Sequence, residues 1–147
     1  PETYVVSEEQ RLDLYKRIAL IDSEEGRDEM LDELIDRFGE PSRSVQNLLF
    51  IAMLRMEAHK AFVTDIVQRP EEIVFTLFER AAIDASGIPA VIEKNKPYVT
   101  FTADAKHPAF HYFYKKNSRI KPKDLPDLVM TFVKELQGLA LNQKSEN

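Results

Sequence analysis

Apolar residues recur at helical spacing through the first sixty positions of the chain. The spacing predicts a first helix over residues 8–21, a second helix that ends at Phe38 and a third over about residues 44–62. Gly39 stands directly after the second helix, at the position where glycine commonly ends a helix. The third helix carries apolar residues around most of its circumference, which is typical of a helix that packs against neighbours on more than one side.

After residue 62 the pattern changes to short runs with the alternation of half-buried strands. We expect strands over residues 63–67 and 73–77, a short helix over 86–95, strands over 98–102 and 110–114, and a closing amphipathic helix after residue 123. This order of elements predicts an α+β fold, in which an N-terminal three-helix segment packs with a small ββαββα lobe whose C-terminal helix closes the chain.

The length of 147 residues suits a single domain. We expect this domain to span residues 1–141, with a helical part over 7–62 and a mixed part over 63–139, followed by a disordered tail over 142–147. The longest apolar run is too short to cross a bilayer and no signal peptide opens the chain, so we expect an intracellular protein without a membrane partner. A start at Pro1, without a methionine, suggests a processed chain or a piece of a longer one.

Acidic residues concentrate in the second predicted helix. The whole chain has a net charge of −5, but residues 22–40 alone hold nine acidic and two basic residues. At about 100° per residue, the apolar side of this helix is formed by Met30, Leu31, Leu34, Ile35 and Phe38. The opposite side is formed by Glu25, Glu29, Asp32, Glu33, Asp36 and Glu40. Because such a block repels phosphate, we do not expect the first half of the chain to bind nucleic acid.

This acidic side has two interpretations. It is either an ordinary solvated face or a docking surface for basic side chains of a partner. Like charges four residues apart, such as Glu29 and Glu33, repel each other when no cation is near. The chain has no lysine between Lys16 and Lys60, which favours a partner that supplies the cations.

The residues that usually perform catalysis or bind metals do not form a recognisable set. The chain has no cysteine and four scattered glycines, which excludes thiolate chemistry and a glycine-rich phosphate loop. His107 and His111 are four residues apart, but in a loop and a strand this spacing does not bring both rings to one metal. We therefore expect no catalytic, cofactor or metal site here, and a small hydrolase or metal enzyme is an alternative without a supporting motif.

A basic segment follows the predicted aromatic strand over residues 110–114. Its cations are Lys115, Lys116, Arg119, Lys121 and Lys123. One interpretation is a solvated loop, and the other is a surface that contacts phosphates or an acidic partner, with neighbouring tyrosines available to stack on bases. A nucleic-acid-binding accessory domain is therefore the alternative function, although we expect no direct contact with nucleic acid.

Three segments within the first sixty residues together resemble one protein family. They are RLDLYKRI at residues 11–18, ELIDRFGEP at 33–41, and VQNLL at 45–49 with Ile51 and Ala52. In this order and spacing they resemble the C-terminal (TRCF) domain of bacterial transcription-repair coupling factors. The later half of the chain resembles that domain in its ββαββα order and closing helix.

The resemblance implies a regulatory domain without an active site. The full chain of this family is a helicase-like, ATP-dependent DNA translocase of nucleotide excision repair, which binds stalled RNA polymerase and recruits UvrA. It binds ATP and magnesium outside the C-terminal domain, which packs on the N-terminal UvrB-like module of the same chain and hides the surface that binds UvrA. The family's acidic positions fall here on Glu33 and Asp36, with Glu29, Asp32 and Glu40 beside them. The resemblance thus implies an autoinhibitory protein-interaction domain in the bacterial cytoplasm.

Overall fold

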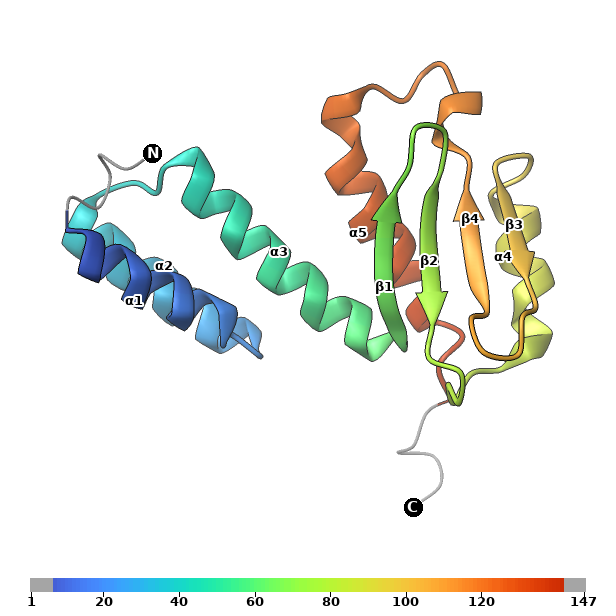
Figure 1. Cartoon of the computed structure of the whole chain (residues 1–147), viewed down its shortest axis with the longest axis horizontal. Helices are drawn as coiled ribbons and strands as arrows, with labels where there is room; N and C mark the ends of the chain where they lie inside the picture. The colour runs from blue at the N-terminus through green and yellow to red at the C-terminus, as the bar shows by residue number, and fades with distance from the viewer. Residues whose placement is uncertain (1–6, 142–147) are drawn as a thin grey trace. The chain divides into compact units, whose positions relative to one another are not determined.

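The computed structural model describes residues 7–141, and the chain divides into two compact units, Pro1–Met56 and Glu57–Asn147 (Figure 1). The sequence suggested one domain with a change from helical to mixed structure at residue 62. The division between the units falls slightly earlier, inside the third helix. The tail predicted to be disordered lies outside the described residues.

The first unit consists of three helices, as predicted. They are α1 (Glu8–Ala19), α2 (Glu24–Phe38) and most of α3 (Arg43–Lys60). Ser7 and Ser23 cap the first two helices, because their hydroxyl oxygens accept hydrogen bonds from the backbone N–H groups of Gln10 and Gly26. Gly39 follows α2 with a φ of +83°, which explains why a glycine stands there.

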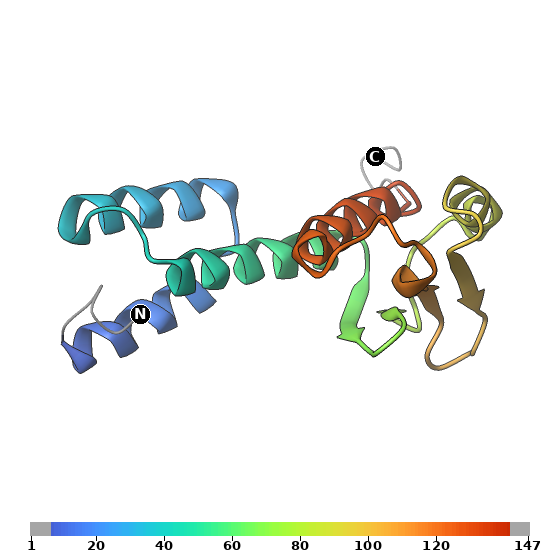
Figure 2. The same ribbon diagram turned by 90° about the horizontal axis from the view of Figure 1, so that it is seen from above.

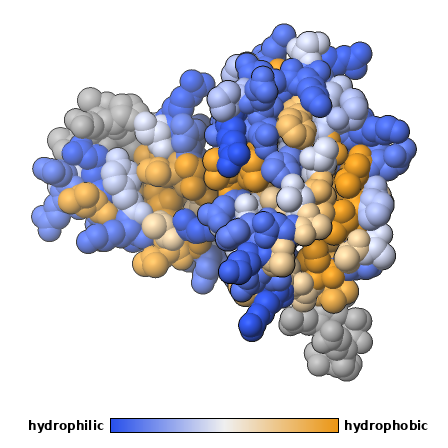
Figure 3. All heavy atoms as spheres, turned by 45° about the vertical axis from the view of Figure 1, so that its right-hand side comes forward, coloured by the Kyte–Doolittle hydropathy of each residue, from blue (hydrophilic) through white to orange (hydrophobic). Residues whose placement is uncertain are grey.

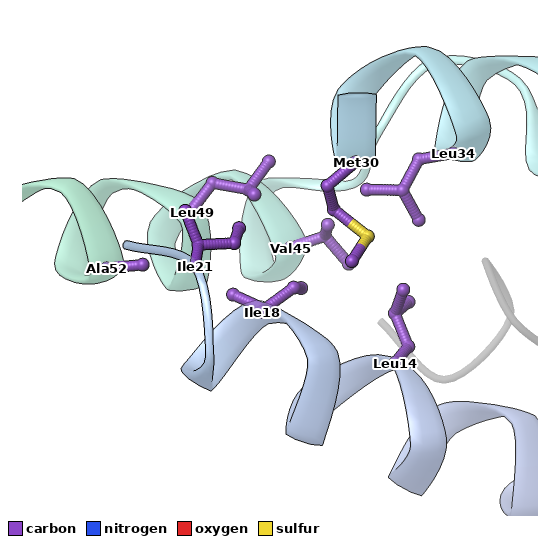
Figure 4. Packing of buried hydrophobic residues seen from close by; sticks show 8 residues of the cluster. All are labelled: Leu14, Ile18, Ile21, Met30, Leu34, Val45, Leu49 and Ala52. Atoms are coloured by element: carbon purple, nitrogen blue, oxygen red, sulfur yellow. The ribbon is translucent and has the colours of Figure 1, made fainter. Parts of the chain in front are cut away.

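The three helices of the first unit enclose a small hydrophobic core (Figure 4). Its buried members are Leu14, Ile18, Ile21, Met30, Leu34, Val45, Leu49 and Ala52. Leu31 and Phe38 are partly buried and pack against this core. The predicted apolar side of α2 is therefore confirmed at four of its five positions.

Two apolar side chains of this unit are exposed where packing was predicted. Ile35 on α2 is 40% exposed and Ile51 on α3 is 55% exposed. Each stands one position from a fully buried residue, Leu34 or Ala52, and one step along a helix turns a side chain by about 100° away from the core. The prediction that Ile35 is core is therefore wrong, and Ile51 belongs to the part of the apolar circumference of α3 that is exposed. In the space-filling view, apolar patches reach the surface of both units (Figure 3).

The second unit is a four-stranded antiparallel sheet with helices on one face (Figure 2). The strands are β1 (Val63–Gln68), β2 (Ile73–Leu77), β3 (Val99–Thr102) and β4 (Ala109–Tyr112), in the spatial order β1-β2-β4-β3. The helix α4 (Ile88–Lys94) connects β2 to β3, and α5 (Leu125–Gln137) follows β4. The predicted α+β class and the ββαββα order are confirmed.

An aromatic cluster attaches α5 to the sheet. Phe132 of α5 packs its ring against Phe75 on β2 at a centroid distance of 4.8 Å, and against Phe110 on β4 at 5.8 Å. Tyr112 contacts the same ring edge-on at 5.3 Å. Phe75 and Phe110 are completely buried, so these rings form the centre of the second core.

The fourth strand ends earlier than predicted. The sequence pattern extended it to Tyr114, but β4 stops at Tyr112 and Tyr114 begins a 3₁₀ turn, η2 (Tyr114–Lys116). The buried Tyr114 donates hydrogen bonds from its hydroxyl to the carbonyl oxygens of Arg69 at 2.6 Å and Pro70 at 3.2 Å. These bonds to the β1–β2 turn position Tyr114 outside the strand, and alternation in the sequence does not reveal them.

Replacement of Leu34 tests the first core. Leu34 is 1% exposed, so Leu34→Ala should lower the free energy of unfolding by about 2–5 kcal/mol through lost burial and an unfilled cavity. The matched control is Ile35→Ala, at the exposed neighbouring position, with an expected loss below about 1 kcal/mol. Urea denaturation followed by circular dichroism measures both, and equal losses would contradict the observed burial.

Candidate functional site

The acidic face of α2, defined as Glu29, Asp32, Glu33, Asp36 and Glu40, is the candidate docking surface. Glu33 is partly buried and the other four are exposed. Glu40 lies beyond the end of α2, which stops at Phe38, so helical spacing does not place it with the other acids. The face presented by the helix itself therefore consists of four carboxylates.

Glu33 is bound by two arginines of the same unit. Arg17, in the last turn of α1, donates from Nη1 to Oε2 at 2.5 Å and from Nη2 to Oε1 at 2.6 Å, which makes a bidentate pair. Arg37, one turn further along α2, donates from Nη1 to Oε2 at 3.1 Å. The Glu33 side chain is 35% exposed, so this cluster lies at the surface and not in the core.

The two arginines change the acidity of Glu33. The hydrogen bonds from Arg17, followed by those from Arg37 and the charges of both, lower the pKa of Glu33 to about 2. The same contact raises the pKa of Arg17. Glu33 is thus firmly ionised, with both of its oxygens already accepting hydrogen bonds.

The other acids of the face lack the arginine contacts that Glu33 has. Within the part of the chain that the structure describes, Glu29, Asp32, Asp36 and Glu40 form no ion pair and accept no side-chain hydrogen bond. The sequence favoured a partner as the source of cations for this face, but for Glu33 the chain itself supplies two arginines. The carboxylates that can accept a partner's cation without displacing another are those of Glu29, Asp32 and Asp36 on the helix.

The sequence pattern does not reveal that Arg17 binds Glu33. The spacing of four residues between Glu33 and Arg37 is a helix pairing that the sequence alone makes visible. Arg17 lies sixteen residues before Glu33 on another helix. Only the packing of α1 against α2 brings these two side chains together.

The basic segment, residues 115–123, joins β4 to α5. It passes through η2 and a second turn, η3 (Pro122–Asp124). Its five cations are exposed, and none forms an ion pair with another described residue. The basic segment belongs to the second unit, whereas the acidic face belongs to the first.

His111 has a hydrogen-bonding partner at each of its ring nitrogens. His111 contacts Glu72 through Nδ1 at 2.6 Å and Thr102 through Nε2 at 2.9 Å. Residues 7–141 contain no group of three or more side chains of the kinds that bind metals. Over the same residues, no helix is long and apolar enough to span a membrane.

Comparison of the sequence with known proteins finds matches to one family. The family model of the TRCF domain matches residues 1–88. The transcription-repair-coupling factor of Bacillus subtilis is 33% identical over 87 residues, which cover 59% of this chain and 7% of that protein. The transcription-repair-coupling factor of Escherichia coli is 25% identical over 141 residues, which cover 96% of this chain and 12% of that protein. The chain thus corresponds to a small part of the length of these relatives.

A solved structure has the same fold. The crystal structure of the C-terminal domain of transcription-repair coupling factor superposes with a TM-score of 0.76 and covers 100% of this chain and 89% of that one. The two sequences are 21% identical, so this likeness concerns the fold. The family match over residues 1–88 includes the acidic face, whereas the basic segment lies outside it.

Removal of Arg17 tests the Glu33 cluster. Arg17→Ala should raise the pKa of Glu33 from about 2 toward its ordinary value of 4.5, because the largest cause of the shift is lost. A carbon-13 NMR titration of the Glu33 carboxyl measures this change. The control is Arg27→Ala, which removes an arginine that pairs with Asp28 instead, and should leave the pKa of Glu33 unchanged.

The same substitution changes how stability depends on pH. The pKa of Glu33 is depressed in the folded chain, so its ionised form stabilises the fold above about pH 4.5, and this contribution is lost as the pH falls toward about 2. Arg17→Ala should make the loss of stability in this interval less steep. An identical pH dependence in both proteins would contradict the pairing.

Proposed function

The chain belongs to the TRCF domain family, and on this premise we propose that it is an autoinhibitory protein-interaction domain of a transcription-repair coupling factor. In this proposal the acidic face of α2 docks on the N-terminal UvrB-like module of the same protein. Docking covers the surface to which UvrA binds, until the DNA translocase engages stalled RNA polymerase. The domain itself carries out no reaction, and ATP and magnesium bind elsewhere in the parent protein.

The observation that carries this proposal is the set of exposed carboxylates without a cation. Glu29, Asp32 and Asp36 lie within eight residues on one helix and form no ion pair with a described residue, so their mutual repulsion is not relieved inside the described chain. Arginine or lysine side chains of a partner would relieve it. The buried side of α2 supports this arrangement, because the core fixes the rotation of the helix and thereby the direction of the acids.

A contact of this kind suits a reversible lock. Exposed ion pairs contribute about 0.2–1 kcal/mol each and are weakened by salt. A few such pairs hold two modules of one chain together, because the tether makes the local concentration high. The same weakness allows the contact to open when another interaction competes with it.

We expect Asp36 and Glu33 to have different roles, because only Glu33 has internal partners among the described residues. Both oxygens of Glu33 accept hydrogen bonds from Arg17, so a partner's cation must share or displace an internal arginine to reach it. Asp36 is exposed and has no such competitor among the described residues. We therefore expect Asp36 to contribute more to docking, and Glu33 more to the joining of α1 and α2.

Charge reversal in the full-length protein tests the proposal. Asp36→Lys should raise the affinity for UvrA by about tenfold, equivalent to about 1.4 kcal/mol, because repulsion from the partner's cations exposes the masked surface. Basal ATP turnover should rise with it. Glu93→Lys changes the charge equally at an exposed position on α4 and should leave both quantities unchanged.

Two results would count against this assignment. If UvrA affinity is the same in Asp36→Lys as in the unaltered protein, the acidic face does not mask UvrA binding. If Glu93→Lys raises UvrA affinity as much as Asp36→Lys does, the effect comes from net charge and not from α2.

A further inference from the structure

The basic segment is the most strongly charged surface of the second unit. Five of its nine residues are cations, and no acidic residue interrupts the run from 115 to 123. We propose that this segment binds the phosphate groups of a nucleic-acid backbone. This goes beyond the docking proposed for α2, because it uses another unit, the opposite charge and residues outside the family match. It also replaces the expectation from the sequence that the chain makes no direct contact with nucleic acid.

The cations stand on ordered turns. Tyr114 anchors the start of the segment through its hydrogen bonds to the carbonyl oxygens of Arg69 and Pro70. In the middle, the Asn117 side chain accepts a hydrogen bond from the backbone N–H of Arg119 at 3.0 Å. At the end, Asp124 accepts one from the backbone N–H of Lys121 at 2.9 Å. Because the backbone is already ordered, binding an anion costs little additional conformational entropy.

The segment borders a cleft of the second unit. The cleft has a volume of about 260 Å³. Its polar walls are formed by Gln68, Tyr114, Lys115, Asn117, Ser118 and Lys121, and its apolar walls by Ile120, Pro122 and Leu125. The ammonium group of Lys121 donates to the Ser118 carbonyl at 3.4 Å, a long hydrogen bond that a phosphate oxygen can replace. Lysine ammonium, amide and hydroxyl groups are the donors that proteins use for phosphate contacts.

The cleft also has acidic neighbours. Asp124 lies at the end of the segment, but its carboxylate already accepts the hydrogen bond from Lys121 N–H. Glu71 is exposed, and its backbone carbonyl accepts from the Lys115 N–H at 3.4 Å. Arg69, in the same β1–β2 turn, is exposed and adds a sixth cation beside Glu71. Cations therefore outnumber carboxylates on this surface.

The pattern fits a phosphate backbone better than an acidic protein. Protein interfaces usually place apolar anchors among the charges, and none of the exposed large apolar side chains falls within residues 115–123. A nucleic-acid backbone carries only negative charge at regular intervals, which a row of cations of one sign matches. A protein partner would leave most of this row without apolar support.

The test is fluorescence anisotropy of the 147-residue chain with a labelled DNA duplex, measured over salt from about 20 to about 200 mM. If three to five phosphates are contacted, the logarithm of the affinity should fall against the logarithm of salt concentration with a slope of about −3 to −4.5. Lys115→Gln/Lys121→Gln should weaken binding by at least about tenfold at low salt and make the slope smaller by about 2.

A matched variant controls for net charge. Arg80→Gln/Lys106→Gln removes two exposed cations that form no ion pair with a described residue and that lie at the opposite end of the sheet. This control variant should retain the salt dependence of duplex binding and most of the affinity for the duplex. Circular dichroism of both variants checks that each retains the fold of the unaltered chain.

Several outcomes would overturn the proposal. One is the absence of duplex binding at low salt. Another is an equal loss of duplex affinity in Lys115→Gln/Lys121→Gln and in Arg80→Gln/Lys106→Gln. Displacement of the duplex by poly-glutamate at the same charge concentration would assign the segment to an acidic protein instead. Displacement by inorganic phosphate at the same phosphate concentration would assign it to a free anion.

Discussion

Burial of Leu34 fixes the orientation of α2, and the candidate docking surface depends on it. α2 buries Leu34 together with Met30 in a small core, so the helix cannot rotate without exposing these side chains. With Leu34 inside, Asp32 and Asp36 point to solvent. Glu33, next to Leu34, is partly buried and comes within reach of Arg17 on α1. The same constraint therefore builds the core, the internal ion pair and the outward acidic face.

The Arg17–Glu33 contact gives one carboxylate of the acidic face an internal partner. Its oxygens accept bidentate hydrogen bonds from an adjacent helix, so Glu33 joins α1 to α2 at the surface. Asp36 is only three residues away but meets no such donor among the described residues. Two acids of the same segment thus differ in their interactions because they differ in their tertiary neighbours.

In the second unit, aromatic side chains form the core and the basic segment lies at the surface. Phe132 holds α5 against β2 and β4 through ring contacts, so the chain between β4 and α5 must cross the end of the sheet. Tyr114 ties this crossing to the β1–β2 turn. The lysines that follow are exposed and form no ion pair with a described residue, although Lys116 lies over the Phe113 ring at 4.8 Å. The packing of Phe132 and Tyr114 therefore determines where the basic segment lies on this unit.

The sequence by itself determined the elements, their order and the apolar side of α2, because capping serines, Gly39 and helical periodicity act over only a few residues. It also indicated the acidic face and the basic segment as charge runs. The tertiary structure alone decided that Arg17 binds Glu33, that Ile35 is exposed and that Tyr114 leaves the strand. Each of these features depends on a residue distant in the chain or on how far another helix covers a side chain. Local sequence patterns cannot predict them, because such patterns reflect only neighbours within a few residues.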